Sequence, residues 1–308
     1  MNSQIVITAA LTGPIASKKD NPALPTSPQE IADAATRAYN AGAAVVHIHL
    51  RDAQERPTAD LDIARKTVDL IREQSPVLIQ LSTGVGLETP FEDREKLVEL
   101  KPRMATLNPC SMSFGVGEFR NPPAGVRRLA ARMQELGVKA ELEIYDFGHI
   151  PVCLSLYEEG LLADPLQFSI VMGVKGGMAA TVDNLLFAVR SLPPGAIWQV
   201  IAIGRANLEL SAIAVAMGGN ARTGLEDALY LRKGELAPSN EALVTRLASV
   251  CSTLERSIAT VEDAAREFKL ETGPASLLTV GSTSDARHFT RGFTWNEQWT
   301  RGSSVRTI

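Results

Sequence analysis

Short strand-like runs alternate with helical segments eight times along this chain, and this alternation limits its fold more than any other feature. The runs are brief and rich in β-branched residues, as expected for buried strands. They lie at Gln4–Ala10, Val45–Leu50, Val77–Ser82, Met104–Asn108, Lys139–Tyr145, Gln167–Gly173, Ile197–Gly204 and Gly219–Gly224. Eight strand–helix units within about 230 residues are typical of the α/β class and its (β/α)8 TIM barrel.

The helical segments between these runs support the barrel. Each has apolar residues at a period of 3.6, as in Pro28–Ala41, Asp60–Gln74, Gly125–Leu136, Thr181–Ser191 and Asn207–Met217. Before the first of them, Ser27 offers a capping hydroxyl and Pro28 and Glu30 follow it, which predicts a helix start. A doubly wound open sheet is the alternative, but no Gly-x-Gly-x-x-Gly follows the first strand.

The regular pattern ends before the chain does. Residues Pro238–Leu270 predict two extra C-terminal helices after the eighth strand. From Glu271 onward Gly, Ser, Thr and Arg dominate, with Trp295 and Trp299 among them. We therefore expect a single catalytic barrel domain over residues 1–270 and an irregular tail over residues 271–308. The tail is either disordered or an arm that packs on a neighbouring subunit, and its two tryptophans favour packing.

Charge and composition exclude several classes of protein. The net charge of −4 provides no basic field for nucleic acid or anionic lipid. Apolar runs such as Ile5–Leu11 are far shorter than the roughly 20 residues of a membrane helix, and no basic leader precedes the first strand. Cys110, Cys153 and Cys251 lack metal-type spacing and are odd in number, so we expect reduced thiols in a cytoplasmic protein.

Two of the four histidines, His47 and His49, lie two residues apart in the second predicted strand. Alternate residues of a strand point to one side, so both imidazoles enter the same end of the barrel. Active sites of such barrels lie at the carboxyl ends of the strands, where His-x-His can offer two nitrogen ligands to zinc or another first-row metal. The alternative is a pair of core histidines, which would be costly to bury without polar partners.

A carboxylate after the eighth predicted strand is the candidate third ligand. Arg222 and Glu226 have the same parity, so an extended chain would turn both to one side. Strands eight and two both neighbour strand one in a closed barrel, so Glu226 can reach a metal held by the two histidines. We expect Asp227 to begin the next helix, close to the metal but not bound to it. The alternative is a helix-capping acid with a surface ion pair.

Further polar side chains end the third and fourth predicted strands. Ser82 follows the third strand, and Thr106 and Asn108 lie at the end of the fourth. Beside a cation, such groups suit a carboxylate or a carbonyl oxygen, although alone they are mostly turn formers.

The fifth predicted strand carries two carboxylates, Glu141 and Glu143, on one face. An inward carboxylate needs a cationic partner, and Arg222 is the candidate. The nearby His149 is interpreted as a residue of a loop rather than as a ligand.

Taken in order, these motifs resemble those of the β-keto acid cleavage enzymes, whose founding activity is 3-keto-5-aminohexanoate cleavage. The likeness extends from about residue 4 to 270 and includes Asn21–Pro25 and Ser239-Asn240. The motifs that carry it are His47-Ile48-His49-Leu50-Arg51-Asp52, Ser82-Thr83-Gly84, Ala105-Thr106-Leu107-Asn108, Glu141-Leu142-Glu143 and Arg222-Thr223-Gly224-Leu225-Glu226-Asp227.

The resemblance implies a TIM barrel that holds Zn²⁺ on His47, His49 and Glu226. It also implies an acyltransferase reaction in which a β-keto acid and acetyl-CoA give acetoacetate and a new acyl-CoA. Zinc bound to the keto oxygen would act as a Lewis acid, and no redox cofactor is required. Barrels of this family assemble into tetramers, so we expect a homo-oligomer, a dimer of dimers.

The resemblance also implies roles for individual residues. Ser82 and Thr106 would bind the carboxylate and keto group of the substrate, and we add Asn108 beside them as a substrate-binding residue. The charged network that activates the substrate would consist of Arg222, Asp227 and Glu143. A Claisen-type step needs a base near the carbon acid, and Asp227 is the candidate base.

One position departs from the family pattern. The founding enzyme carries a glutamate in the loop after strand one that suits the amino group of its substrate. Here that loop reads Thr12-Gly13-Pro14-Ile15, with Pro14 at the matching position. We therefore predict that 3-keto-5-aminohexanoate is not the preferred substrate, and that a neutral or otherwise substituted β-keto acid is.

Three other functions remain open at this point. An amidohydrolase-like metal hydrolase also uses His-x-His, but on the first strand and with later histidines, whereas none lies between His149 and His288. A metal-dependent aldolase is closer in chemistry and differs in not requiring acetyl-CoA. A non-catalytic metal-binding barrel would bind the ion without turnover.

Overall fold

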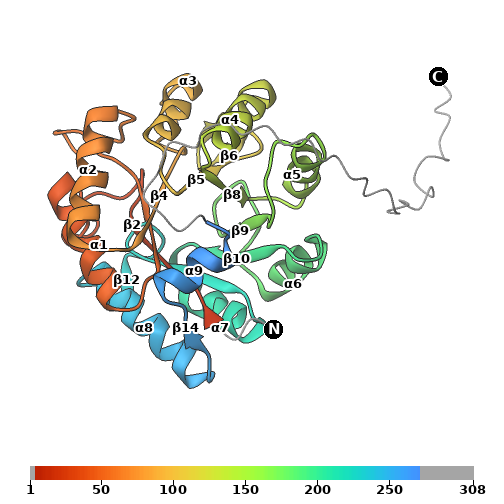
Figure 1. The fold of residues 1–308 in the computed structure, drawn as a ribbon. Coiled ribbons are helices and arrows are strands. Elements are labelled where there is room, and N and C mark those ends of the chain that lie inside the picture. The colour runs from red at the N-terminus through yellow and green to blue at the C-terminus, as the bar shows by residue number, and fades with distance from the viewer. Residues whose placement is uncertain (1–3, 271–308) are drawn as a thin grey trace, which may run out of the picture. The chain divides into compact units, whose positions relative to one another are not determined.

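The eight predicted strands close into a parallel barrel in the computed structural model, which describes residues 4–270 (Figure 1). The eighth strand pairs with the first, so the ring has no open edge and the doubly wound sheet is excluded. Around the ring the strands are β2 (Ile7–Thr12), β3 (Val45–Ile48), β4 (Leu78–Leu81), β5 (Met104–Leu107), β8 (Lys139–Ile144), β9 (Gln167–Met172), β10 (Ile197–Ala202) and β11 (Asn220–Thr223).

Helices surround the barrel, as Figure 1 shows, and all seven predicted helices are present. The predicted ones are α1 (Pro28–Asn40), α2 (Leu61–Gln74), α4 (Pro123–Glu135), α6 (Val182–Ser191), α7 (Asn207–Met217), α8 (Asn240–Thr253) and α9 (Val261–Glu267). Two helical stretches were not predicted. One is α5 (His149–Glu158), and the other is α3 (Phe91–Arg94), which continues into the 3-10 helix η1 (Glu95–Leu100). A short 3-10 helix η2 (Gly204–Ala206) precedes α7.

The start of α1 is fixed by its capping residues, as the sequence indicates. The Ser27 hydroxyl accepts a hydrogen bond from the Glu30 amide at 3.2 Å, and the Glu30 carboxylate accepts one from the Ser27 amide at 3.0 Å. Pro28 occupies the first turn, where its missing N–H is not needed. Each such cap contributes about 1 kcal/mol and sets where the chain leaves the loop after β2.

The amino-terminal end of the barrel is closed by residues from both ends of the described chain. Strand β1 (Gln4–Ile5) pairs in parallel with β14 (Ser257–Ile258), and α9 follows β14. Phe268 and neighbouring alanines then pack on Val45, Leu78 and Met104 at the starts of the strands. In Figure 1 the blue α9 lies across the centre of the ring. The site residues therefore lie toward the other end, where the strands finish.

The two faces of the strands differ in polarity. Their outward residues belong to two apolar clusters that include Val46 and Ile48 on β3 and Leu142 and Ile144 on β8. The residues between them point inward and are polar, such as His47, Gln80, Glu141, Glu143, Gln167, Ser169, Gln199 and Arg222. The interior of this barrel is therefore a buried polar network, whose hydrogen bonds must be satisfied side chain by side chain.

Two antiparallel hairpins extend the loops at the carboxyl ends of the strands. Strands β6 (Met112–Phe114) and β7 (Gly117–Phe119) follow β5, and β12 (Tyr230–Arg232) and β13 (Glu235–Leu236) follow β11. Both lie in connections where barrels carry their functional groups.

Several sequence-based predictions concern features that the described residues do not test. The predicted tail, residues 271–308, lies outside them.

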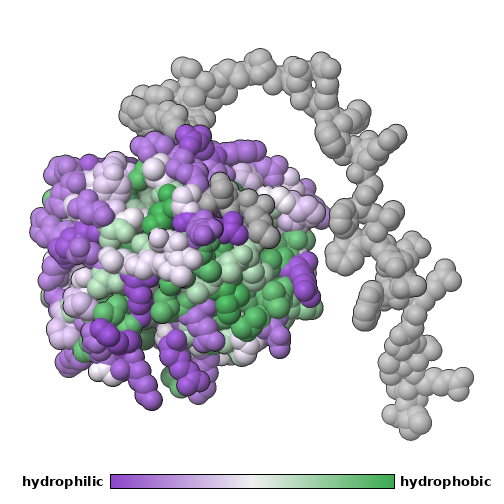
Figure 2. All heavy atoms as spheres, turned by 90° about the horizontal axis from the view of Figure 1, so that it is seen from below, coloured by the Kyte–Doolittle hydropathy of each residue, from purple (hydrophilic) through white to green (hydrophobic). Residues whose placement is uncertain are grey.

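Within residues 4–270, no helix combines the length and the hydropathy that crossing a membrane requires. Figure 2 shows one face of the molecule, where hydrophobic side chains gather in patches among hydrophilic ones. Such patches are typical of interaction surfaces, but the homo-oligomer stays a prediction.

Candidate active site

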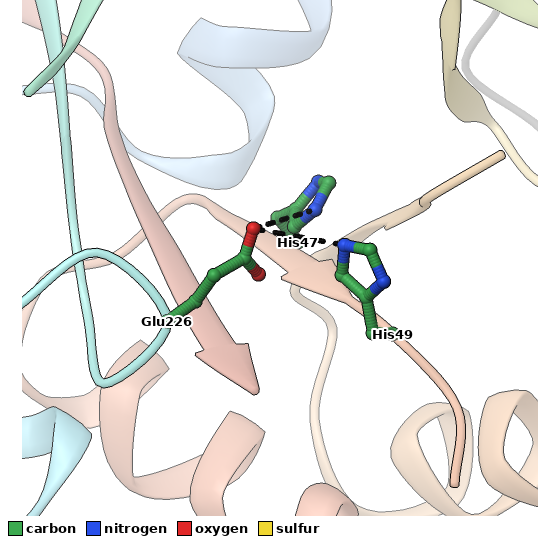
Figure 3. Close-up of side chains that lie close together, drawn as sticks. All are labelled: His47, His49 and Glu226. Atoms are coloured by element: carbon green, nitrogen blue, oxygen red, sulfur yellow. Dashed lines mark ion pairs between the residues drawn. The ribbon is translucent and has the colours of Figure 1, made fainter. Parts of the chain in front are cut away.

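His47 and His49 lie at the carboxyl end of β3 and turn toward one carboxylate, as Figure 3 shows. The Nε2 atoms of the two rings lie 3.5 and 3.6 Å from the Oε1 atom of Glu226. One ligand atom from each residue falls within 4.8 Å of the others. The structure therefore brings together the three residues that the sequence proposes as metal ligands.

These three side chains fit a divalent metal ion. Within residues 4–270, His47 Nε2 and Glu226 Oε2 are buried and have no hydrogen-bond partner. A buried polar atom without a partner costs free energy, and a cation between the three groups would remove that cost. Two imidazole nitrogens and one carboxylate oxygen form a donor set that catalytic zinc sites use, with a further position for a substrate oxygen.

A tight turn after β11 carries Glu226 to the histidines. Gly224 has a φ of +148°, and a Cβ atom there would lie 2.1 Å from the carbonyl oxygen of Ala10 on β2. The Glu226 amide then donates to that same carbonyl oxygen at 3.2 Å. The turn thus fixes the candidate third ligand against β2, the barrel strand that lies between β11 and β3.

The same turn corrects one expectation. Asp227 was expected to begin a helix, but it lies within the turn, with its amide donating to the Gly224 carbonyl at 3.0 Å. The next regular element is the β12–β13 hairpin, and α8 begins only at Asn240. The reason is that glycine at position 224 lets the chain fold back on β2 before any helix can start.

Replacing Gly224 with alanine is expected to destabilise the fold and weaken metal binding. The added Cβ meets backbone that cannot move aside, and a strained φ alone costs on the order of 1–3 kcal/mol. Gly234→Ala is the matched control, since Gly234 has a φ of +81° but no atom within 4 Å of its Cβ position. Thermal unfolding and zinc titration of both variants test this, and equal losses would contradict it.

Arg222 joins the carboxylates of the site into one network. Its Nε and Nη2 atoms donate to Asp227 at 2.9 and 2.8 Å, which is a bidentate pair. Nη2 also donates to Glu226 Oε1 at 2.7 Å, and Nη1 lies 3.7 Å from Glu143 Oε1. The guanidinium is only 3% exposed, so these interactions are little screened by solvent. The structure therefore places the predicted network of Arg222, Asp227 and Glu143 beside the candidate metal ligand Glu226.

Burial and neighbouring charges give the carboxylates of the site different pKa values. Burial raises the pKa of Glu143 to about 7, and it also raises the pKa of Asp227. The pKa of Glu226 lies well below its ordinary value, because Arg222 and the two histidines outweigh the effect of burial. Glu226 is therefore the permanent anion expected of a metal ligand, while Asp227 accepts protons more readily than an exposed aspartate.

The predicted substrate-binding residues lie around the loop after β4. The Thr83 amide donates to Thr106 Oγ1 at 3.0 Å, and the Thr83 hydroxyl donates to the Thr106 carbonyl at 2.7 Å. A Cβ at Gly84 would lie 3.3 Å from Ser82 Oγ and 3.7 Å from Asn108 Nδ2. Both polar atoms of the Asn108 side chain are buried and lack partners within residues 4–270. Ser82 and Asn108 thus flank Gly84, and their role toward a substrate stays a prediction.

The prediction of a cationic partner was wrong for Glu141. Two amides hold this carboxylate instead: Gln80 Nε2 donates to its Oε2 at 2.5 Å, and Gln167 Nε2 donates to the same atom at 3.0 Å. Gln80 also contacts His47, and sequence reasoning did not single it out. What identifies Gln80 is its position in the sheet, because Gln80 on β4 is the residue paired directly with His47 on β3.

Two other residues of the quoted motifs have structural partners. Arg51 donates to the carbonyl oxygens of Gly13 and Ala16, which ties the loop after β2 to the loop after β3. His149 begins α5, and its Nδ1 accepts from the Tyr145 amide at 3.3 Å. His149 is therefore part of the α5 start, and it does not belong to the group of potential metal ligands formed by the described residues.

Comparisons with known proteins identify a family for this chain. A family model described as beta-keto acid cleavage enzyme matches residues 4–270. The 3-keto-5-aminohexanoate cleavage enzyme of Fusobacterium nucleatum subsp. nucleatum is 38% identical over 273 residues, which cover 88% of this chain and 100% of that protein. The 3-oxoadipate:acetyl-CoA acetyltransferase of Cupriavidus necator is 36% identical over 268 residues, which cover 86% of this chain and 94% of the relative.

A solved structure supports the fold independently. The binary complex of ObcA with oxaloacetate superimposes with a TM-score of 0.70 at 20% sequence identity. The match covers 81% of this chain and 68% of that one. At this level of identity the likeness bears on the barrel alone.

Proposed function

This chain belongs to the beta-keto acid cleavage enzyme family, and we propose that it is a zinc-dependent acyltransferase that acts on a β-keto acid and acetyl-CoA. The single observation that carries the metal-dependent chemistry is the convergence of His47, His49 and Glu226 within 4.8 Å. The relatives support the class of reaction, since one of them is named as a 3-oxoadipate:acetyl-CoA acetyltransferase.

The proposed reaction exchanges the acyl groups of its two substrates. The bond between C2 and C3 of the β-keto acid breaks, and a new bond forms between C2 and the carbonyl carbon of the acetyl group. The thiol of CoA leaves the acetyl group and receives the released acyl group. The products are acetoacetate and a new acyl-CoA, so atoms balance with no oxidant or reductant.

Zinc would be held by the two imidazoles of His47 and His49 and by the Glu226 carboxylate. When bound, the ion supplies a Lewis acid that stabilises negative charge on the keto oxygen of the substrate. Two neutral ligands and one anion leave the site with a net positive charge for that purpose. Arg222 donates to Glu226 at 2.7 Å, which keeps the carboxylate oriented toward the histidines.

Asp227 is proposed as the base that removes the proton from C2. The bidentate contact with Arg222 fixes its carboxylate, and it lies in the same turn as the metal ligand Glu226. Its raised pKa, caused by burial, brings its proton affinity closer to that of a carbon acid than an exposed aspartate would have. Glu143, also held near Arg222, completes the charge network on the opposite side of the guanidinium.

Ser82, Thr106 and Asn108 are proposed to orient the substrate. Their hydroxyl and amide groups lie at the ends of β4 and β5, the two strands that follow β3 in the ring. The unpartnered amide of Asn108 can both donate to a carboxylate and accept from a hydroxyl group. Such fixed donors hold the C2 carbon of a β-keto acid within reach of the base.

The loop after β2 supports a substrate without an amino group. A Cβ atom at Gly13 would lie 2.5 Å from Cγ of Glu226, so this loop directly borders the proposed metal centre. Its next residues are Pro14 and Ile15, neither of which carries charge. A cationic amine entering here would lose its water without gaining a carboxylate partner.

We expect kcat/KM to be higher for neutral β-keto acids than for 3-keto-5-aminohexanoate. The measurement is acetoacetate formation from acetyl-CoA with a panel of substrates. Pro14→Glu is expected to shift the preference toward the amino substrate by roughly 10- to 100-fold, because a charge-assisted hydrogen bond contributes about 1.5–3 kcal/mol. Highest efficiency with the amino substrate in the unaltered enzyme would refute the prediction.

The same assay tests the proposed function itself. Acetyl-CoA must be consumed together with the β-keto acid, and acetoacetate and acyl-CoA must appear in equal amounts. An aldolase would cleave its substrate without acetyl-CoA, and a hydrolase would release no acyl-CoA. Either result would replace the proposed function.

A further inference from the structure

A chain of buried hydrogen bonds crosses the barrel interior behind one of the proposed metal ligands. His47 Nδ1 lies 2.7 Å from Gln80 Oε1, and Gln80 Nε2 donates to Glu141 Oε2 at 2.5 Å. Gln167 Nε2 donates to the same carboxylate oxygen at 3.0 Å. These four side chains lie on neighbouring or facing strands and are 3% exposed or less. The proposed reaction does not use Gln80, Glu141 or Gln167, so their arrangement calls for another explanation.

The carboxylate of Glu141 determines which group donates and which accepts in each of these hydrogen bonds. A carboxylate offers only acceptors, so the NH₂ group of Gln80 must face Glu141. The carbonyl oxygen of the Gln80 amide then faces His47, and it can only accept. His47 must therefore carry its proton on Nδ1, which leaves the lone pair of Nε2 directed at Glu226.

Without Glu141 the amide of Gln80 would have no preferred direction. A half-turn of the amide would place its NH₂ group against His47 Nδ1 and select the other tautomer. The proton would then sit on Nε2, the atom that faces Glu226, and that nitrogen could not bind a metal. The carboxylate of Glu141, although it touches no ligand itself, determines which nitrogen of His47 is free.

The cost of burying Glu141 supports a specific role. No ion pair to this carboxylate forms within residues 4–270, and its second oxygen has no hydrogen-bond partner there. A buried carboxylate with only amide partners is expensive relative to an apolar residue. By contrast, His49 Nδ1 lacks a hydrogen-bond partner within the same residues. Of the two histidines, only His47 therefore has its Nδ1 atom fixed by a hydrogen bond, which it makes with Gln80.

We propose that Gln80 and Glu141 are positioning residues that hold His47 in the tautomer required for metal binding. This inference rests on the proposed function, because it takes His47 as a metal ligand. It assigns a role to a strand residue and a buried carboxylate that touch neither the ion nor the substrate. Loss of such an outer partner typically lowers metal affinity by about 10- to 100-fold.

Zinc affinity of the metal-free protein tests the proposal without any turnover. Competition with a chromophoric chelator gives the dissociation constant for Zn²⁺ in each variant. Gln80→Leu and Glu141→Leu are expected to weaken zinc binding by about 10- to 100-fold. Glu141→Gln is expected to weaken zinc binding less than Glu141→Leu, because its carbonyl oxygen can still accept from both glutamines, although its NH₂ group also allows the opposite direction.

The barrel offers a matched control on another strand. Gln199 on β10 is equally buried, and its amide donates to Ser169 Oγ at 2.9 Å rather than to a group beside a ligand. Gln199→Leu removes the same number of atoms from the same interior and is expected to leave zinc affinity unchanged. Equal affinities of Gln80→Leu and Gln199→Leu would overturn the proposal, as would Glu141→Gln binding as weakly as Glu141→Leu.

A second measurement reports the tautomer directly. With only four histidines in the chain, ¹⁵N-labelled histidine gives few ring signals, which His47→Ala assigns. In the metal-free protein we expect the His47 proton on Nδ1, and in Glu141→Leu a share on Nε2. A neutral His47 ring with its proton on Nε2 in the unaltered protein would overturn the proposal even if a leucine variant failed to fold. If the unaltered protein bound no zinc at all, the proposed function would fail instead, which separates the two results.

Discussion

Asp227→Asn is expected to slow turnover by on the order of 10²-fold or more, the contribution of a general base, while the metal stays bound. Asparagine has the same shape and can still accept a hydrogen bond from Arg222, so the turn after β11 should persist. It cannot accept a proton from C2 of the substrate. Acetoacetate formation measures the rate, and elemental analysis measures the metal.

Proton abstraction can be separated from the later steps. In D₂O, a base at position 227 exchanges the C2 protons of the β-keto acid, and the Asn variant should lose the exchange above the uncatalysed rate. Asp62→Asn serves as a control, because Asp62 also pairs with an arginine, Arg65, but its side chain is 93% exposed. An unchanged rate of turnover in Asp227→Asn would remove Asp227 from the mechanism.

The sequence predicts the barrel well because the periodicity of each strand and helix is a local signal, and eight alternating units are typical of this fold. All eight strands lie within their predicted runs, apart from β2, which extends two residues further. The last residues of several runs leave the sheet as loops. His49 is one of them, yet its ring still faces Glu226 together with the ring of His47. The pairing of the two histidines therefore did not require the strand to continue through both.

The features that were missed depend on side chains meeting across the fold. Glu141 was assigned a cationic partner because a lone strand cannot reveal that two glutamines on β4 and β9 reach its carboxylate. Helix α5 was missed because its sequence, His149-Ile-Pro-Val-Cys-Leu-Ser-Leu-Tyr-Glu, is apolar on nearly every side and lacks an amphipathic period. The turn at Asp227 depends on the contact between Gly224 and Ala10, which lie far apart in the sequence.

The features that the sequence did not predict are mostly residues around the candidate site, rather than the candidate metal ligands themselves. Candidate metal ligands can be recognised in a sequence because few residue types bind zinc, and because residues two apart in a strand point to the same side. The groups proposed to orient those ligands have no such signature, since a glutamine in a strand is usually an ordinary polar residue. Gln80 is recognised only from the strand pairing in the structure, which places it opposite His47.

His49→Ala is expected to release the metal and abolish the acyl exchange. Without its imidazole, the site keeps one nitrogen and one carboxylate oxygen, too few ligands to hold zinc against a chelator. The metal content, determined by elemental analysis after dialysis, should fall from one ion per chain to near zero. His149→Ala is the matched control, because His149 is also a buried histidine but contacts the Tyr145 amide rather than Glu226. Full zinc retention by His49→Ala would refute its role as a ligand, whereas loss in both variants would indicate a general weakening of the barrel.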